Sequence, residues 1–189
     1  VALSSLSAQA EGYKLLEQSV SSMGNAYAGR GAQITDATLV YSNPAALTQL
    51  QGEHFAGGLN LIHVRTRYDD VNAVNARGLP VQGRDSGNVL LTEVVPFAFY
   101  SQQLTERLSW GLGFYVPFGL SSDYQQDWAG RYFADETAVQ VLSLQPAVGY
   151  KLTDWLSIGG AISLNRAEGT LSKYKDHSGL CELGSGIAQ

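Results

Sequence analysis

The sequence predicts an all-β protein: the N-terminal part of an antiparallel transmembrane β-barrel, with about five strands and a small helical plug before them. Three observations support this prediction. Apolar residues alternate with small or polar ones over runs of about ten residues, the length that a tilted strand needs to cross a bilayer. Long and short connections follow one another in turn, and aromatic residues flank the short ones, as in outer-membrane barrels.

Five runs carry this alternation and are predicted to be strands. In chain order they are residues 53–68, 89–101, 108–118, 138–150 and 155–165. The first two are the least regular, because the apolar residues change face at Leu61 and Ile62 in one and Pro96 interrupts the other. We expect a bulge or an edge-like irregularity in both of them.

The connections between these runs orient the predicted barrel. Residues 102–107 and 151–154 are short, whereas residues 69–88 and 119–135 are long, polar and rich in aromatic side chains. Short connections of outer-membrane barrels are periplasmic and long ones are external, so residues 11–52 are expected on the periplasmic side. A soluble β-sandwich also alternates with a period of two, so a soluble lipid-binding or structural β-protein is the alternative.

The segment before the first strand is predicted to fold inward as a plug. Asn43 can accept a hydrogen bond from a helix start and Pro44 suits the first helical position, so a capped helix of about two turns is expected, ending near Gly52. Such a short helix is marginal alone in water and needs a surface to pack against. The less apolar strand faces hold mainly Ser, Gly, Ala, Tyr and Asn, with no charged residue between 108 and 122. They leave room for a plug or an apolar solute.

The first ten residues, VALSSLSAQA, resemble the end of a secretory signal peptide. Ala8-Gln9-Ala10 fits the small-x-small cleavage pattern, and apolar residues precede it. The alternative is a disordered tail rich in serine and alanine. On the first hypothesis the mature chain begins at Glu11.

The composition argues against several other functions. The net charge is −5, from 12 Lys+Arg and 17 Asp+Glu, and no basic cluster is present to bind nucleic acid. The single cysteine, Cys181, excludes an internal disulfide, and the histidines have no metal-ligand spacing to one another. A lipase or esterase that uses Ser86 ranks last, because the strand-to-helix turn of a nucleophile loop is missing. We expect no catalytic residue, no metal and no cofactor.

Three stretches of the sequence resemble the FadL-type outer-membrane transporters for long-chain fatty acids and related hydrophobic compounds. They are SSMGNAYAGRGAQITDATLVYSNPAALTQL, GFYVPFGLSSDYQQDWAGRYF and VQVLSLQPAVGYKLTDWLSIGGAISL. The first is the most specific, because the family's Asn-Pro-Ala motif stands at Asn43, Pro44 and Ala45, before the first strand. The resemblance implies that residues 11–52 are a hatch that closes the barrel and that residues 53–175 form strands one to five.

The resemblance also implies a route for the transported compound. In this family the third strand kinks inward and opens a gap in the barrel wall, through which substrate is thought to leave sideways into the membrane. The matching residues here are Gly113, Pro117, Phe118 and Gly119. Glycine and proline weaken or bend a ladder; the alternative is that they merely end the strand at Pro117. The aromatic residues of the matching external loop, where family substrate contacts lie, are Tyr124, Trp128, Tyr132 and Phe133.

The resemblance further implies a protein of the bacterial outer membrane that is not an enzyme. Its expected partners are a long-chain fatty acid or another hydrophobic small molecule and the lipid of the outer membrane, with no nucleic acid, and we expect a monomer. The family barrel has more strands than this chain supplies. Residues 176–189 break the alternation and do not resemble the family, which is the pattern of a truncated or frame-shifted product.

Overall fold

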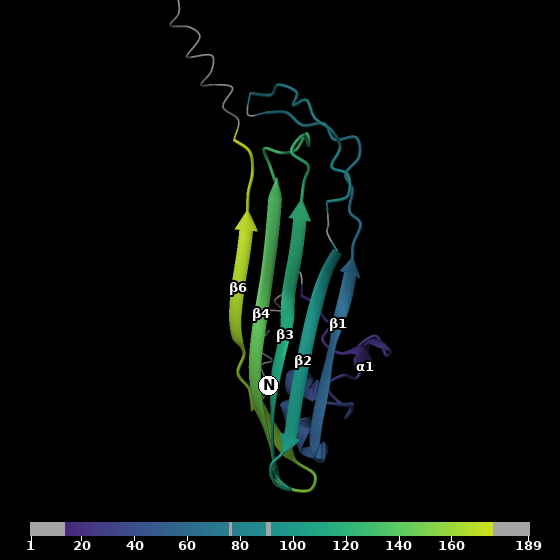
Figure 1. Cartoon of the computed structure of the whole chain (residues 1–189), viewed down its shortest axis with the longest axis vertical. Coiled ribbons are helices and arrows are strands. Elements are labelled where there is room, and N and C mark those ends of the chain that lie inside the picture. Colours follow the sequence, from purple (N-terminus) through teal and green to yellow (C-terminus); the bar gives the residue numbers. More distant parts are fainter. Residues whose placement is uncertain (1–13, 76, 90–91, 176–189) are drawn as a thin grey trace, which may run out of the picture.

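The computed structural model describes residues 14–75, 77–89 and 92–175 of the 189-residue chain. The predicted signal-peptide end at residues 1–10 and the tail at residues 176–189 lie outside the described residues. Within the described part, one antiparallel sheet forms the body of the molecule (Figure 1). Residues 14–52, which we call the N-terminal segment, pack on this sheet.

Six strands of the described residues form this sheet, and all paired strands are antiparallel. Their bounds are β1 (Glu53–His63), β2 (Thr92–Gln103), β3 (Leu108–Asp123), β4 (Glu136–Lys151), β5 (Ser157–Ala161) and β6 (Leu164–Leu171). The order is β1-β2-β3-β4-β5, and β6 also pairs with β4. The long connections lie at one end of the sheet, called the loop end, and the short ones at the other, called the turn end (Figure 1).

The fifth predicted strand is present but interrupted. β5 pairs with the turn-end half of β4, and β6 pairs with its loop-end half. The break at Ile162 and Ser163 lies opposite Gln145 and Pro146, where the N–H of Ile162 still donates to the carbonyl of Pro146 at 3.1 Å. Because proline has no N–H to return, the ladder is incomplete at this point.

The irregularities expected in the first two strands are only partly present. The pairing of β1 with β2 is continuous from Glu53 to His63, so the expected bulge at Leu61 and Ile62 is wrong. Pro96 does lie where one of the two ladders of β2 has ended. The pairing of β2 with β3 ends at Phe97, the next residue, so the missing N–H of Pro96 interrupts no ladder with β3.

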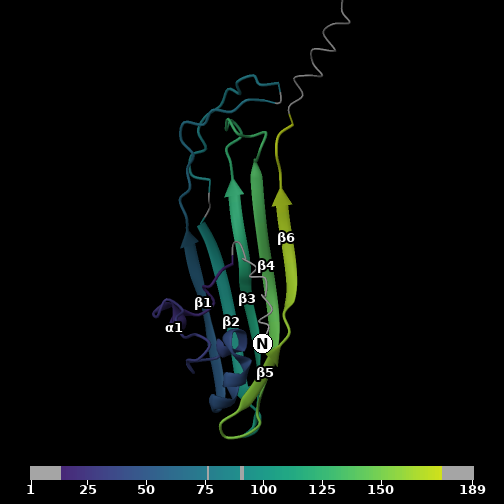
Figure 2. The same ribbon diagram turned by 180° about the vertical axis from the view of Figure 1, so that it is seen from behind.

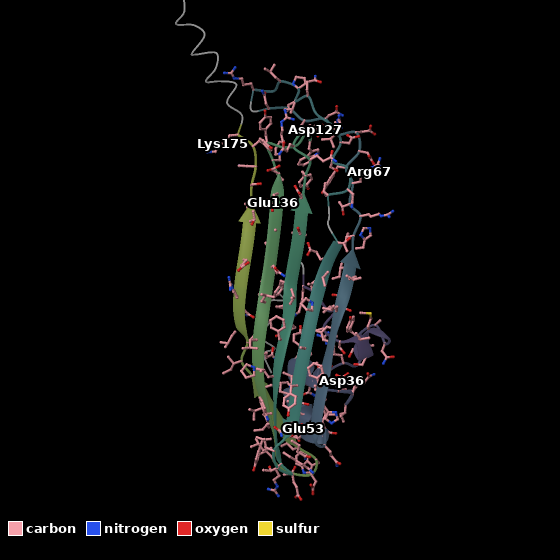
Figure 3. All side chains as sticks on the ribbon, viewed as in Figure 1. Asp36, Glu53, Arg67, Asp127, Glu136 and Lys175 are labelled. Atoms are coloured by element: carbon pink, nitrogen blue, oxygen red, sulfur yellow. The ribbon has the colours of Figure 1, made fainter. Side chains whose placement is uncertain are left out.

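The two faces of the sheet differ, as the alternation predicts. One face exposes large hydrophobic side chains, including Phe55, Leu59, Leu61, Leu112, Phe114, Leu144 and Val148. The N-terminal segment covers part of the opposite face, towards the turn end (Figure 2). Labelled charged side chains lie at the two ends of the sheet, with Glu53 at the turn end and Arg67, Asp127 and Glu136 towards the loop end (Figure 3).

Three short helices lie in the N-terminal segment: α1 (Val20–Met23), α2 (Leu39–Ser42) and the 3₁₀ helix η1 (Pro44–Gln49). The helix predicted at the Asn-Pro-Ala motif therefore exists, in the tighter 3₁₀ form. It ends before Gly52, whose positive φ of 81° turns the chain towards β1. Within the described residues, no helix is long and apolar enough to cross a membrane.

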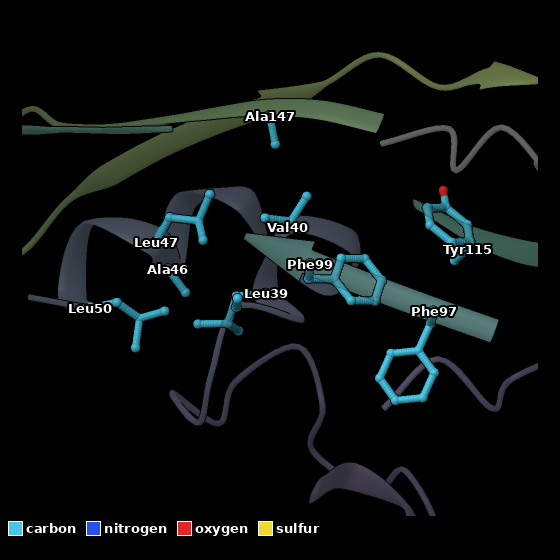
Figure 4. Close-up of a cluster of buried hydrophobic side chains, with 10 residues drawn as sticks. Leu39, Val40, Ala46, Leu47, Leu50, Phe97, Phe99, Tyr115 and Ala147 are labelled. Carbon is cyan, nitrogen blue, oxygen red and sulfur yellow. The ribbon is translucent and has the colours of Figure 1, made fainter. Parts of the chain in front are cut away.

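The hydrophobic core lies between the N-terminal segment and the sheet (Figure 4). The segment contributes Ala37, Leu39, Val40, Ala46, Leu47 and Leu50, and the sheet contributes Phe97, Phe99, Tyr115 and Ala147. The rings of Phe99 and Tyr115 stack with their centres 5.7 Å apart, and Tyr41 meets Tyr115 edge-on at 4.8 Å. Helices this short are unstable alone, so burial against the sheet is what holds them.

Candidate functional site

The Asn-Pro-Ala motif lies directly on two glycines of the sheet. Gly149 of β4 and Gly159 of β5 are paired across the ladder, and we call them the motif seat. A Cβ atom at Gly159 would stand 2.3 Å from the backbone nitrogen of Ala45, and one at Gly149 would stand 2.5 Å from the carbonyl oxygen of Pro44. Both distances are too short for any side chain, so glycine is what lets the motif backbone reach the sheet.

A buried hydrogen-bond network fixes the segment one turn earlier. Val40 is completely buried, and the Nε2 of Gln145 in β4 donates to its carbonyl oxygen at 2.7 Å. The Oε1 of Gln145 accepts hydrogen bonds from the hydroxyl of Tyr115 and, at 2.9 Å, from that of Ser163. This one side chain therefore connects the N-terminal segment to β3, β4 and the chain between β5 and β6.

Gln145→Leu should lower the free energy of unfolding by about 2 kcal/mol or more. The substitution leaves two buried polar groups, the carbonyl of Val40 and the hydroxyl of Tyr115, without their partner, and each such group costs about 1–3 kcal/mol. Denaturant unfolding of the purified protein in detergent, followed by tryptophan fluorescence, measures the change. Gln140→Leu, at an exposed position of the same strand, is the matched control. Equal losses in the two variants would show that the network does not hold the segment.

Asn43 does not cap the helix as predicted. Its side chain makes no capping hydrogen bond, and its Nδ2 instead donates to the carbonyl oxygen of Gly31 at 2.6 Å. The reason is that α2 ends where η1 begins: the N–H of Asn43 donates to the carbonyl of Leu39 at 2.9 Å. Pro44 does occupy the first position of η1, as expected. Asn43 therefore occupies the N-cap position of η1 and accepts a hydrogen bond from the N–H of Ala46 through its carbonyl, while its side chain binds Gly31.

The third strand continues past its proline. β3 runs through Pro117 to Asp123, so the alternative that the strand ends at Pro117 is wrong. Its register with β4 shifts between Tyr115 and Phe118, and Gly119 follows directly after the shift. Of the four residues matched to the family's gap, Pro117 lies within the shift, and Phe118 and Gly119 are the first two residues paired with β4 after it.

The fourth residue, Gly113, lies in the regular part of β3. It pairs with Phe99 of β2 on one side and with Gln145 of β4 on the other. A Cβ atom at Gly113 would stand 2.7 Å from the ring of Phe99. This glycine makes room for the packed phenyl ring and is not part of the irregularity.

β2 and β3 separate at the same point. Their ladder ends at the pair Phe97–Tyr115, although β2 continues on β1 to Thr92 and β3 continues on β4 to Asp123. A cavity of about 240 Å³ lies there, and we call it the β2–β3 gap. It is lined by Leu15, Ile62, Val64, Glu93, Val94, Val95, Val116, Gly119, Leu120, Ser121, Ala138, Val139 and Gln140. This lining is mostly apolar, and Glu93 is its charged member.

The start of the described chain runs along this gap. Lys14 forms an isolated antiparallel bridge with Phe118, and the N–H of Leu15 donates to the carbonyl of Pro117 at 2.8 Å. Gln18, which is 1% exposed, donates through its Nε2 to the carbonyl of Val116 at 3.2 Å. The chain here satisfies carbonyl groups of β3 that β2 does not reach.

The four external-loop aromatics are not brought together in one pocket. Tyr124 and Trp128 stack with ring centres 3.9 Å apart, and Tyr68 from the other long connection lies 6.4 Å from both. Trp128 is only 8% exposed. Tyr132 instead lies under the guanidinium of Arg131, and Phe133 is 74% exposed. None of the four lines the β2–β3 gap.

The two long connections dock on each other. The backbone N–H of Arg84 donates to the carbonyl of Asp127 at 2.9 Å, and Ala129 returns a hydrogen bond to Arg84 at 3.0 Å. An exposed ion pair between Arg84 and Asp127 accompanies them at 3.0 Å. Burial among these rings raises the pKa of the Tyr124 hydroxyl, and the nearby Tyr68 raises it further. Among the described residues, no group of three or more His, Cys, Asp or Glu could hold a metal ion.

Leu15 and Glu93 line the gap and Gln18 binds β3 beside it, but none of the three was predicted from the sequence. Gln18 contacts a carbonyl 98 positions away, and no local pattern marks such a contact. Glu93 had a signal: it is the charged residue in the otherwise apolar run LLTEVVPFAF. A charge inside a lipid-spanning strand is expensive and commonly functional.

The chain is similar to a known protein family and to individual outer membrane proteins. The family model described as outer membrane protein transport protein (OMPP1/FadL/TodX) matches residues 1–188. A Neisseria meningitidis serogroup B protein described as an outer membrane protein is 35% identical over 126 residues, covering 67% of this chain and 27% of its own. The long-chain fatty acid transport protein of Escherichia coli K12 is 28% identical over 176 residues, covering 92% and 38%.

A solved structure shares the fold. The crystal structure of a Pseudomonas aeruginosa FadL homologue matches with a TM-score of 0.70 at 22% identity, over 86% of this chain and 39% of that one. The chain thus spans between 27% and 38% of the length of the curated relatives it matches. The antiparallel sheet is accordingly the N-terminal part of a barrel fold, as predicted.

The family match confirms the resemblance seen in the sequence. The family is one of transport proteins rather than enzymes, which agrees with the absence of a catalytic motif in the sequence. Its members lie in the outer membrane, so a soluble β-protein, the alternative reading of the alternation, is not supported. Taken with the strand pattern and the fold, the match means that this chain belongs to the OMPP1/FadL/TodX family of outer membrane transport proteins and is located in the bacterial outer membrane.

Proposed function

We propose that the N-terminal segment is the hatch of a transporter for hydrophobic compounds and that these compounds leave sideways through the β2–β3 gap. The observation that carries the proposal is the separation of β2 and β3 around an apolar cavity. In a barrel wall, such a separation connects the lumen with the surrounding lipid. An apolar compound could pass there without crossing water.

The lining of the gap comes from both faces of the sheet. Val94 and Val95 are neighbours in β2, and both line the cavity. Neighbouring strand residues point to opposite faces, and their burial agrees, since Val95 is 3% exposed and Val94 is 51% exposed. Gly119 and Leu120 of β3 are another such pair of neighbours in the lining. Residues that point to either face of the sheet therefore contribute to the lining of the cavity.

The anchoring of the segment supports a sideways exit over one towards the turn end. The motif seat, at Gly149 and Gly159, leaves no space between the sheet and the motif backbone. Gln145 adds a buried hydrogen bond to the same segment. A compound moving along the barrel axis would have to displace these contacts, whereas β2 and β3 are already separated at the gap.

The substrates we propose are long-chain fatty acids or other hydrophobic compounds, released into the lipid of the outer membrane by a monomer. The Escherichia coli relative is named as a long-chain fatty acid transport protein, and the apolar gap lining suits such molecules. For capture from outside, Phe133 and Tyr132 are the better candidates. Tyr124 and Trp128 are engaged in holding the two long connections together.

Gly119→Trp tests the sideways exit. The indole would enter the lining of the gap, where even a Cβ atom at this position comes within 3.2 Å of Leu15. Uptake of a labelled fatty acid by cells that express the variant should fall towards the level of cells without the protein. The amount of protein at the cell surface should stay unchanged.

The control is Gly169→Trp in β6, a position paired with Val139, which also pairs with Leu120 beside Gly119. Gly169 thus lies at a similar height in the sheet but is not part of the gap lining. Undiminished uptake in the Gly119→Trp variant, at normal surface level, would rule out this exit.

A further inference from the structure

We propose that the β2–β3 gap favours uncharged hydrophobic solutes over carboxylates and that Glu93 determines this preference. The inference rests on the transport function proposed above and specifies its substrate class. A long-chain fatty acid would then pass in its protonated form. Alcohols, esters and hydrocarbons of similar size would pass as they are.

Glu93 lies in β2 beyond the end of the β2–β3 ladder. It pairs with Ile62 of β1, and both residues line the gap. Val95, two positions along the strand, points to the same face as Glu93 and is 3% exposed. This is the face that the N-terminal segment covers, so in a closed barrel Glu93 would stand on the lumen side of the gap. A solute moving from the lumen to the lipid would pass its carboxylate.

No cation of the described chain neutralises this carboxylate. Within the described residues the side chain of Glu93 makes neither a hydrogen bond nor an ion pair, and the gap lining contains no lysine, arginine or histidine. Two acidic residues of the long connections, by contrast, do have cationic partners. Asp69 pairs with Arg67 at 2.6 Å, and Asp127 pairs with Arg84 at 3.0 Å. Among the described residues, the carboxyl group of Glu93 thus has no cationic partner beside this apolar passage.

Such a charge discriminates between headgroups and not between hydrocarbon tails. Two negative charges about 5 Å apart repel each other enough to change occupancy about fourfold at the dielectric constant of water and more than a hundredfold at about 20. An alcohol and a carboxylate of equal chain length bury the same tail. The ratio of the uptake of the alcohol to that of the carboxylate therefore isolates the effect of the headgroup charge.

The test compares uptake of labelled tetradecanol and tetradecanoate by cells that express the protein, with cells lacking it as background. Glu93→Gln keeps the size of the side chain and removes its charge. It should raise tetradecanoate uptake at least about fourfold and leave tetradecanol uptake unchanged. Glu93→Lys should raise tetradecanoate uptake further. Surface labelling of each variant checks that the amount of protein is the same.

Glu136→Gln is the matched control, because Glu136 begins β4 at the loop end and does not line the gap. This control variant should change the uptake of neither tetradecanol nor tetradecanoate. If both Glu93 variants keep the wild-type ratio of the two solutes, Glu93 is only a solvated surface carboxylate and the inference is overturned while transport stands. If neither solute enters faster than the background in the wild type, the proposed transport function itself fails, and the inference fails with it.

Discussion

Gly159→Ala is expected to lift the Asn-Pro-Ala motif off the sheet and to lower the free energy of unfolding by about 3 kcal/mol. The added Cβ atom would stand 2.3 Å from the nitrogen of Ala45 and 2.5 Å from the carbonyl carbon of Pro44. Both are backbone atoms and cannot escape by a rotamer change, so η1 has to move as a unit. Overpacked sites typically lose about 1–3 kcal/mol and occasionally more, and a rigid backbone neighbour belongs at the upper end.

The neighbouring glycine provides the control for this prediction. Gly160 lies next in β5, points to the opposite face, and a Cβ atom there would meet nothing within 4 Å. Thermal unfolding in detergent and limited proteolysis of residues 14–52 should therefore separate Gly159→Ala from Gly160→Ala. If the segment is the hatch, Gly159→Ala should also make cells more sensitive to large polar antibiotics. Equal stability and protease resistance in the two variants would mean that the motif does not depend on its seat.

The strands could be predicted because their signal is local. The period of two along residues 108–118 and 138–150 reflects a strand with one apolar face, and both segments are strands in the structure. The interruption between β5 and β6 could not be predicted in the same way. Its cause is Pro146 on the neighbouring strand, and which residues Pro146 faces depends on register, which the alternation of one strand does not contain.

The packing of the N-terminal segment was predictable in kind but not in detail. Small residues in the segment and in the sheet indicated close approach, yet the individual contacts, such as Ala45 on Gly159, depend on the tertiary arrangement. Asn43 shows the limit, because its capping role was inferred from residue type alone. Asn43 does stand at the N-cap position of η1, where α2 also ends, but its side chain binds the carbonyl of Gly31 instead of the helix start.

The β2–β3 gap, too, could be predicted from the sequence only in part. Pro117 and Gly119 marked an irregular third strand, but the end of the β2–β3 ladder follows from pairing between distant residues. Trp128 was expected among the substrate contacts of the external loop, and its burial could not be predicted from the sequence. The cause is the close approach of the two long connections, where a Cβ atom at Gly83 would stand 2.6 Å from the backbone of Ala129.

The core between segment and sheet leads to the other large expected effect. Phe99→Ala should lower the free energy of unfolding by about 3–5 kcal/mol. Phe99 is 1% exposed and stacks on Tyr115 at 5.7 Å, with Phe97 at 6.1 Å. Its ring also lies over Gly113, which has no side chain to move into the vacated space. Because sheet hydrogen bonds fix the surrounding backbone, most of the cavity should remain open, and an open cavity adds to the loss of buried area.

Phe133→Ala removes the same side chain from a position that is 74% exposed, and its effect should stay within about 0.5 kcal/mol. Denaturant unfolding of both variants in the same detergent gives the comparison directly. A loss below about 1 kcal/mol for Phe99→Ala would show that the segment closes down into the space. A segment that adjusts so easily could also adjust to a passing solute, and the choice of a sideways exit over the turn end would then lose its main physical support.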